Sequence, residues 1–381
     1  MRERIMHAVA SLLLAAMLLR GAAGEGLRVG VATSEAAGRV FVSAQVWRWL
    51  RGDAPPGHAD LLAWPNGQSF WPVDPLTQLF EAPMQAVLGP DAAFTLIVGL
   101  LLALSTYATA RLTRAVGGGP ASALVAGMAV TLSPFMLRNL RDAVTEALAV
   151  GVAAVAIGAT RRVIREPGRG PLLAGAAAVL ALATSSPYYA VYLALGWAIF
   201  TPFLARKNSP GLARLALVGA AACALAAVPL VVTEGSDGGR LGSSWRGSYR
   251  LEPAPLVHQD GRPEDRTPPR AREATAAGPS FGGTIIPGPL ERGLRRTPGG
   301  AALLLLGLGS LAHRRARPWA ALALGLLVLG PGPDLVTRAL ATGVPSSPSV
   351  LQRVLAALPL TGAMGNPERV LGAWSLLAAV A

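Results

Sequence analysis

Three carboxylates stand out as residues that could do chemistry, because each lies close to the end of an apolar run. Glu35 follows the first run, Asp74 comes later in the same polar segment, and Glu146 lies about one turn inside a later run. A carboxylate at such a place can take a proton from a hydroxyl group or hold a divalent cation. Glu35 and Asp74 can instead be solvated or cap a helix, as can Asp53, Asp60 and Glu81 of the same segment, and Asp74 before Pro75 fits an N-cap with proline at the first helical position.

Arginines near these carboxylates are candidate partners for a phosphate group, since the planar guanidinium donates two parallel hydrogen bonds. Arg138 and Arg141 precede Glu146, and Arg369 lies just before the last apolar run. Asp142 and Glu146 are four residues apart, which predicts that they share one helical face. The alternatives are an ion pair of Glu146 with Arg138 or Arg141 and, for Arg369, a side chain that snorkels to a membrane interface.

Two tyrosines complete the set of candidates. Tyr188 and Tyr189 follow Ser-Ser-Pro at 185–187 and are candidate contacts for a sugar or a lipid, although aromatic residues are expected at a membrane interface in any case. The sequence has no zinc-protease or Cys-x-x-Cys spacing and no phosphate-binding glycine loop. The single cysteine, Cys223, can form no internal disulfide.

Composition identifies the environment in which these residues must work. The 381 residues are 52% hydrophobic and 14% charged, which is not the composition of a soluble chain. Apolar runs near the length that crosses about 30 Å of hydrocarbon fall at 5–24, 92–111, 119–137, 143–160, 171–186, 187–205, 212–232, 300–312, 318–333 and 367–381. We therefore predict an all-α, polytopic membrane protein with about ten transmembrane helices.

The net charge of +13 would by itself suggest a nucleic-acid partner. With the N-terminus in the cytoplasm, however, the alternation of crossings puts the short basic connections on the inner side, as the positive-inside rule requires. These connections hold Arg2, Arg4, Arg111, Arg114, Arg161, Arg162, Arg165, Arg169, Arg206, Lys207, Arg214, Arg314, Arg315 and Arg317. The charge is thus an orientation signal, and it indicates a lipid bilayer rather than nucleic acid as the partner.

Loop lengths divide the chain into five parts. Residues 1–24 are predicted to be an uncleaved membrane anchor, although Arg2 and Arg4 before an apolar core also fit a signal peptide. Residues 25–91 form a first external loop, 92–232 a transmembrane bundle, 233–299 a poorly ordered external loop, and 300–381 the C-terminal transmembrane helices with an external amphipathic segment. The last run is shorter than a usual crossing, which favours a longer parent protein.

The first external loop is predicted to contain two short helices. Residues 35–50 fit an amphipathic interfacial helix whose apolar stripe comprises Val40, Ala44, Trp47 and Leu50. Residues 76–88 fit a second, more apolar helix. Between them, Trp-Pro-Asn-Gly at 64–67 marks a tight turn.

Several short motifs punctuate this layout. Glu35 and the tryptophan-containing helix come first, followed by the turn at 64–67, Trp-Pro-Val-Asp-Pro at 71–75 and Leu-Ser-Pro-Phe at 132–135. Ser-Ser-Pro-Tyr-Tyr at 185–189, Leu-Pro-Leu at 358–360 and Asn-Pro-Glu-Arg at 366–369 come later. In this order they resemble the glycosyltransferase C superfamily of polytopic bacterial membrane proteins, particularly the YfhO-like proteins and related branches.

The resemblance implies a helical protein of the bacterial cytoplasmic membrane that takes a sugar from a polyprenyl-phosphate donor on the external face. The acceptor would be a glycan, a lipid or a protein. It implies that a carboxylate of the first loop is the functional acid, with Glu35 as the first candidate and Asp74 as the second. The donor phosphate or substrate would contact residues drawn from Arg138, Arg141, Glu146, Tyr188, Tyr189 and Arg369. Members of the superfamily commonly carry paired Asp where this chain has the single Glu35, so a divalent cation stays open.

A second hypothesis is a non-catalytic membrane protein or a transporter of lipid-linked glycan precursors. Helices broken by glycine and proline, together with arginines on the outer side, would serve such a protein as well.

Overall fold

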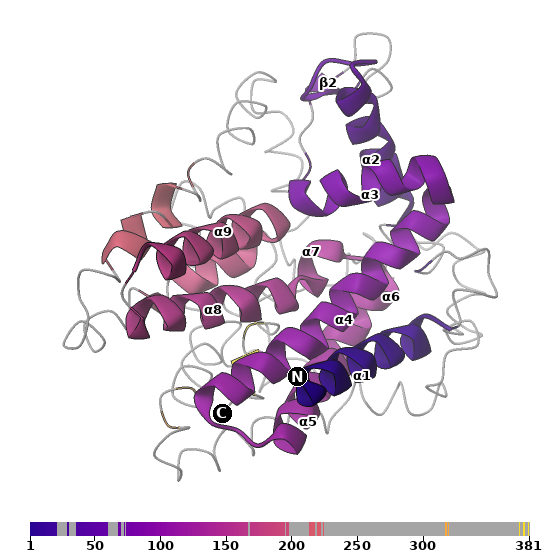
Figure 1. Ribbon diagram of the computed structural model, residues 1–381. Coiled ribbons are helices and arrows are strands. Elements are labelled where there is room, and N and C mark those ends of the chain that lie inside the picture. Colours follow the sequence, from indigo (N-terminus) through magenta and orange to yellow (C-terminus); the bar gives the residue numbers. More distant parts are fainter. Residues whose placement is uncertain are drawn as a thin grey trace, which may run out of the picture.

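A computed structural model describes residues 1–20, 29, 36–59, 68–69, 72, 74–166, 168–194 and 196–197, with further short pieces at 213–217, 219–221, 224, 317, 319, 373, 376–377 and 380. This part of the chain is mostly helical (Figure 1). Its elements are α1 (Arg2–Leu19), α2 (Ala36–Arg51), β1 (His58–Ala59), β2 (Gln68–Ser69), α3 (Pro75–Leu88), α4 (Pro90–Val116), α5 (Pro120–Thr131), α6 (Pro134–Asp142), α7 (Thr145–Leu148), α8 (Val150–Arg165) and α9 (Arg169–Ser185).

Prolines and glycines set the helix boundaries. Helices α3 to α6 each begin with proline, where the missing N–H costs no hydrogen bond. Gly117 ends α4 in the left-handed conformation at φ 107°, which glycine adopts without strain. The glycine-rich connection at 117–119 is therefore a tight turn between α4 and α5.

The segment between α6 and α8 is broken, which corrects one prediction. Ala143 ends α6 with φ 59°, and Thr145 begins the four-residue α7. The predicted shared face of Asp142 and Glu146 is therefore wrong, because the two residues belong to different helices that a left-handed residue separates.

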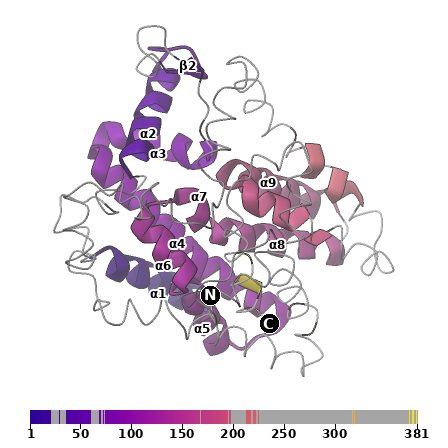
Figure 2. The same cartoon turned by 180° about the vertical axis from the view of Figure 1, so that it is seen from behind.

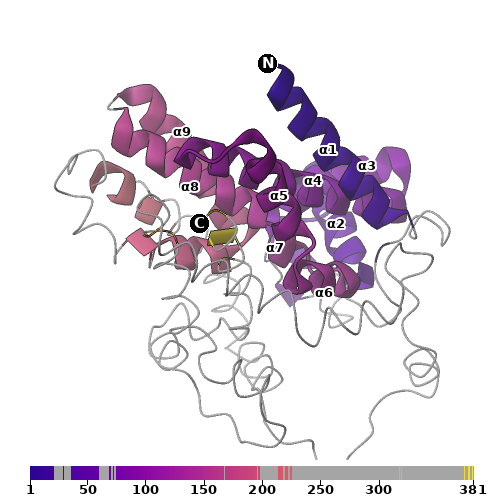
Figure 3. The same ribbon diagram turned by 90° about the horizontal axis from the view of Figure 1, so that it is seen from below.

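Helix α4 is the centre of the described bundle. Helix α1 packs along one side of α4, α5 returns beside it, and α8 packs against it with α9 on the outside of α8. Figures 2 and 3 show the same order from behind and from below, with α1 and the α8–α9 pair on opposite sides of α4 and α5. Helices α2 and α3 lie at the N-terminal end of α4, and α2 projects away from the bundle (Figure 1).

The bundle has two chemically different ends. Leu19 approaches Gly99 and Glu3 bonds to Arg114, so α1 runs antiparallel to α4. Gly151 lies against Ser105 and Gly158 against Leu112, so α8 runs parallel to α4. The start of α1 and the ends of α4 and α8 consequently bring Arg4, Arg111, Arg114, Arg161, Arg162 and Arg165 toward one end, whereas α2, α3 and α7 lie at the other.

Small residues and hydroxyl groups hold the central helices together. A Cβ atom on Gly127 would lie 2.3 Å from the Thr106 carbonyl oxygen, and one on Gly151 would lie 2.5 Å from the Ser105 amide nitrogen. Ser105 Oγ accepts from the Gly151 amide at 3.0 Å, and its proton is within reach of two carbonyl oxygens, that of Leu101 in α4 itself at 2.8 Å and that of Leu148 at 3.1 Å. Close backbone approach with interhelical hydrogen bonds is the packing mode that helices use where burial of apolar surface from water supplies little driving force.

The outward faces of α1 and α3 are apolar. Helix α1 buries His7 and Ser11 while it exposes Ile5, Met6, Val9, Leu12, Leu13 and Met17. Helix α3 buries Thr77, Gln78 and Glu81 while it exposes Leu79, Phe80, Val87 and Leu88. Contiguous exposed apolar surface of this kind marks contact with a partner or a membrane.

Among the described residues, α4 is long and apolar enough to cross a bilayer. The pair α5 and α6, bent by 46°, makes a second crossing if it is counted as one broken span. Helices α1, α8 and α9 occupy parts of three further predicted runs, at 5–24, 143–160 and 171–186. The remaining predicted crossings fall largely outside the described residues. They are 212–232, 300–312, 318–333, 367–381 and the second half of 187–205.

The segment predicted to be the first external loop, residues 25–91, contains the two predicted helices, α2 and α3, but α2 buries a different face from the predicted one. Ala44 and Leu50 of the predicted apolar stripe are exposed, and Val40 and Trp47 are only partly buried. The buried face instead contains Ala36, Arg39, Ser43 and Val46, together with Gln45. Gln45 and Trp49 both donate to the His58 carbonyl at 2.8 Å, which fastens the β1–β2 hairpin to α2.

Replacement of Gly151 by alanine should loosen the contact between α4 and α8. The new Cβ would meet backbone atoms of Leu104 and Ser105 that cannot rotate away, so the free energy of unfolding should fall by about 1–3 kcal/mol. Thermal unfolding of the purified protein measures this. Gly170→Ala in α9 is the control, because its Cβ meets nothing within 4 Å; an equal loss in both variants would contradict the close approach.

Candidate functional site

One buried arginine joins the segment of α2 and α3 to the bundle. Arg39 lies in the first turn of α2 and is 8% exposed. Its Nη1 donates to Asp74 Oδ1 at 2.9 Å, and its Nη2 donates to Glu146 Oε2. Asp74 is 0% and Glu146 3% exposed. These three residues, called the Arg39 triad below, come from α2, the start of α3 and α7.

Asp74 has the backbone position of an N-cap but not the side-chain role. It precedes Pro75 at the start of α3, and its side chain makes no cap hydrogen bond. Its Oδ2 accepts from the Thr145 hydroxyl, and its Oδ1 accepts from Gln78 Nε2 at 3.3 Å as well as from Arg39. The prediction that Asp74 caps α3 with its side chain is therefore wrong. Its carboxylate instead bonds to Arg39 of α2 and Thr145 of α7.

Burial governs the protonation of this carboxylate. Loss of water holds the pKa of Asp74 above its ordinary value, the Arg39 charge opposes this shift, and the neighbouring Glu146 carboxylate adds to it. One guanidinium balances only one of two carboxylates, and an unbalanced buried charge is costly. The triad as a whole is therefore neutral when Asp74 and Glu146 share one proton.

The triad has the components of an acid–base pair. A protonated and an ionised carboxyl group around one cation can give and take a proton without leaving a net charge buried. The Arg39 guanidinium contacts both carboxylates. It occupies the position between them that a bridging divalent cation would need. Within the described ranges no three His, Cys, Asp or Glu side chains form a group that could hold a metal ion.

A polar seam continues from the triad between α2 and α3. Ser43, Gln78 and Glu81 are fully buried there. Gln85 donates to Glu81 Oε1 at 3.0 Å, whereas Glu81 Oε2 and Gln78 Oε1 have no hydrogen-bond partner among the described residues. Burial raises the pKa of Glu81 from its ordinary 4.5 to about 7.

The structure brings together two of the sequence-predicted site residues, Asp74 and Glu146. Glu146 forms an ion pair, as the sequence suggested, but its partner is Arg39. Arg141, one of the two expected partners, pairs with Asp142 at 3.2 Å instead. Glu35 and Arg369 lie outside the described residues, as does the side chain of Arg138 in α6.

The two predicted tyrosines lie just after α9. Tyr188 is partly buried against the core, and Tyr189 is 2% exposed. The Tyr189 hydroxyl donates to the Ala147 carbonyl at 2.7 Å, which places it one residue from Glu146. This bond positions α7, and with it the Glu146 carboxylate.

Sequence reasoning missed Arg39, Thr145, Gln78 and Glu81. Two sets of polar residues follow helical spacing. One is Arg39 and Ser43 on α2, and the other is Asp74, at the start of α3, with Gln78 and Glu81. That repeated polar spacing was the available signal. An interfacial helix is expected to bury its apolar residues, whereas α2 and α3 bury these polar ones.

No protein family, curated protein or solved structure matches this chain.

Removal of the Arg39 charge should destabilise the fold strongly. Arg39→Gln leaves two carboxylates buried without their cation, and breaking a buried pair in this way costs about 3–5 kcal/mol. Arg51→Gln is the control, since Arg51 makes an exposed pair with Asp53 and such pairs contribute about 0–1 kcal/mol. Adding Asp74→Asn to Arg39→Gln should recover part of the loss in a thermal-unfolding cycle; simple additivity would argue against the triad.

The buried Glu81 should make stability depend on pH. Between about pH 4.5 and 7 the unfolded chain has lost the proton that folded Glu81 retains, so the free energy of unfolding falls as pH rises, by at most about 3 kcal/mol. Glu81→Gln should remove this fall and be more stable than wild type at pH 8. Glu166→Gln, whose carboxyl is exposed, should follow the wild-type profile; identical profiles for all three proteins would exclude the effect.

Proposed function

We propose that this chain is a polytopic membrane glycosyltransferase that moves a sugar from a polyprenyl-phosphate donor to an acceptor at the extracytoplasmic face. One observation carries the proposal. A carboxylate of the first external loop, Asp74, and a carboxylate at the start of a bundle helix, Glu146, meet around Arg39 at the end of the bundle away from Arg111 and Arg114.

Three features support a place in the bacterial cytoplasmic membrane with about ten crossings and a cytoplasmic N-terminus. The outward faces of α1 and α3 are apolar. The central helices pack through Gly127, Gly151 and interhelical hydroxyl bonds, as membrane helices do. The basic residues of α1, α4 and α8 gather at one end, which is the distribution that the positive-inside rule associates with the cytoplasmic side.

The chemistry assigns different roles to the charges. An ionised carboxylate takes the proton of the acceptor hydroxyl as its oxygen attacks the anomeric carbon. The bond from that carbon to the donor phosphate oxygen breaks, and polyprenyl phosphate leaves with the electron pair. An arginine stabilises the leaving phosphate through paired hydrogen bonds. Arg39 is suited to this role, and Arg138, Arg141 and Arg369 stay proposed contacts, as do Tyr188 and Tyr189.

Glu35 remains a proposed acid beside Asp74. It precedes Arg39 by four residues in the sequence. Because Asp74 has no exposed surface, substrate must separate at least one carboxylate from Arg39 before a proton can be transferred to it.

The burial of the triad also favours a second candidate function, the transport of lipid-linked glycan precursors. Buried ionisable groups in membrane proteins often serve proton-coupled movement of a substrate, and the triad has two carboxylates for one guanidinium. A transporter of lipid-linked glycan precursors would use a proton taken up by the Asp74–Glu146 pair to release Arg39 and change conformation, without any sugar transfer.

Membranes that contain the protein should transfer a labelled sugar from polyprenyl-phosphate donors. Asp74→Asn and Glu146→Gln should each lower the rate at least about 100-fold, because a general base contributes about 10²–10⁴-fold. Asp53→Asn, in the same loop but exposed, should retain activity. Unchanged rates in both site variants would refute the assignment, and donor movement across proteoliposomes without sugar transfer would favour the transporter.

A further inference from the structure

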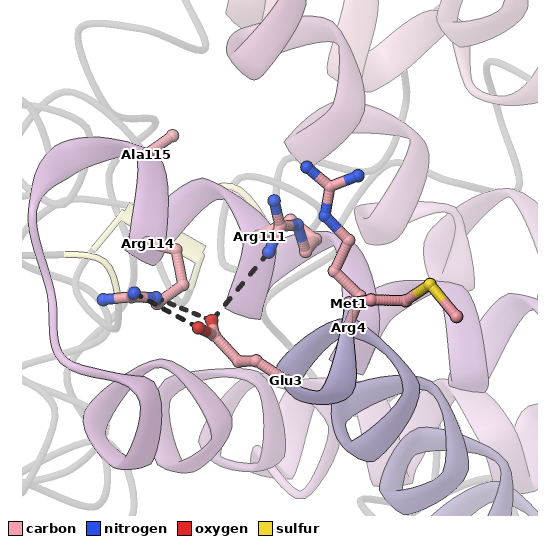
Figure 4. A pocket seen from close by; sticks show the side chains of 6 residues that line it. All are labelled: Met1, Glu3, Arg4, Arg111, Arg114 and Ala115. Carbon is pink, nitrogen blue, oxygen red and sulfur yellow. Dashed lines mark hydrogen bonds and ion pairs between the residues drawn. The ribbon is translucent and has the colours of Figure 1, made fainter.

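A cationic cavity lies at the opposite end of the bundle from the Arg39 triad. It measures about 360 Å³ and is lined by Met1, Glu3, Arg4, Arg111, Arg114 and Ala115 (Figure 4). The first turn of α1 forms one side and the last turns of α4 form the other. Three guanidinium groups against one carboxylate leave this lining with a net side-chain charge of +2.

One of the three arginines is fully committed to the protein. Arg114 donates through Nε and Nη2 to the two oxygens of Glu3, at 2.7 and 3.2 Å, and through Nη1 to the Gly118 carbonyl. The hydrogen bond from Arg114 holds the pKa of Glu3 below its ordinary value. Glu3 is therefore ionised, and its charge is balanced by Arg114.

The other two arginines have binding capacity to spare. Arg111 approaches Glu3 Oε1 only to 3.9 Å, which is too far for a hydrogen bond. Arg4 is exposed and makes no hydrogen bond or ion pair within the described part of the chain. Figure 4 shows the Arg4 guanidinium turned away from Glu3, and a dashed line that joins Arg111 to Glu3 beside the two from Arg114. Two forked donors on one hollow match the oxygens of a phosphate group.

We infer that this cavity binds the phosphate headgroup of an anionic phospholipid. A free phosphate would need only the two guanidinium groups. Here the exposed apolar face of α1 begins at Ile5, directly after Arg4, and continues through Met6, Val9, Leu12, Leu13 and Met17. That face provides a surface along which acyl chains can lie while the headgroup occupies the cavity. The site would anchor α1 to one leaflet of the bilayer.

The inference rests on the membrane placement in the proposed function and is tested without donor or acceptor. The full-length protein, purified in a neutral detergent, is titrated with phosphatidylglycerol, with phosphatidylcholine and with inorganic phosphate, and bound lipid is counted by native mass spectrometry. Wild type should bind phosphatidylglycerol more tightly than phosphatidylcholine. Arg4→Gln with Arg111→Gln should lose this preference on the order of tenfold, since a basic residue near an anionic lipid surface contributes about 1 kcal/mol.

The matched control is Arg165→Gln with Arg169→Gln, which removes the same charge from the ends of α8 and α9 without touching the cavity. This variant should retain the preference, and the melting temperatures of both double variants should match wild type. Equal losses in the two variants would indicate a diffuse basic field and overturn the site. Displacement of the lipid by equimolar inorganic phosphate would overturn the lipid assignment. A failed sugar-transfer assay would count against the proposed function and leave this binding result unaffected.

Discussion

The rest of the described structure depends on a buried charge that cannot be neutralised by losing a proton. Arg39 keeps its guanidinium ionised under all ordinary conditions, so it can be buried only where carboxylates meet it. Asp74 at the start of α3 and Glu146 in α7 provide them. That requirement brings α2, the start of α3 and α7 together at one end of the bundle.

The same constraint explains why the polar seam lies inside and the apolar surface outside. Once Arg39 faces α3, residues one and two turns further along both helices must face inward, and these are Ser43, Gln78 and Glu81. Such burial lowers stability compared with a hydrophobic contact of the same shape. Buried polar groups of this kind are found more often at functional sites than elsewhere in a protein, because local stability is commonly lower there.

Elsewhere the bundle is held by geometry rather than by charge. Gly127 and Gly151 allow α5 and α8 to approach α4 at backbone distance, and Ser105 and Thr106 supply hydrogen bonds across these contacts. This close packing makes α4 a rigid axis. It separates the triad at one end from the arginine-lined cavity at the other, so that two chemically distinct sites share one framework without contact.

From the sequence alone we predicted the helical class, the beginning of α3 at Pro75 and the importance of Asp74 and Glu146, whereas the predicted run at 119–137 is split in the structure into α5 and α6. The first three predictions follow from local chemistry: apolar runs form helices, proline lacks an N–H, and carboxylates are rare in apolar segments. Only the tertiary structure decided which face of α2 is buried and which arginine serves the carboxylates. Hydrophobic periodicity assumes that the buried face is apolar. The contacts of Arg39 join positions 35 and 107 residues apart, and no local pattern specifies a partner at such separations.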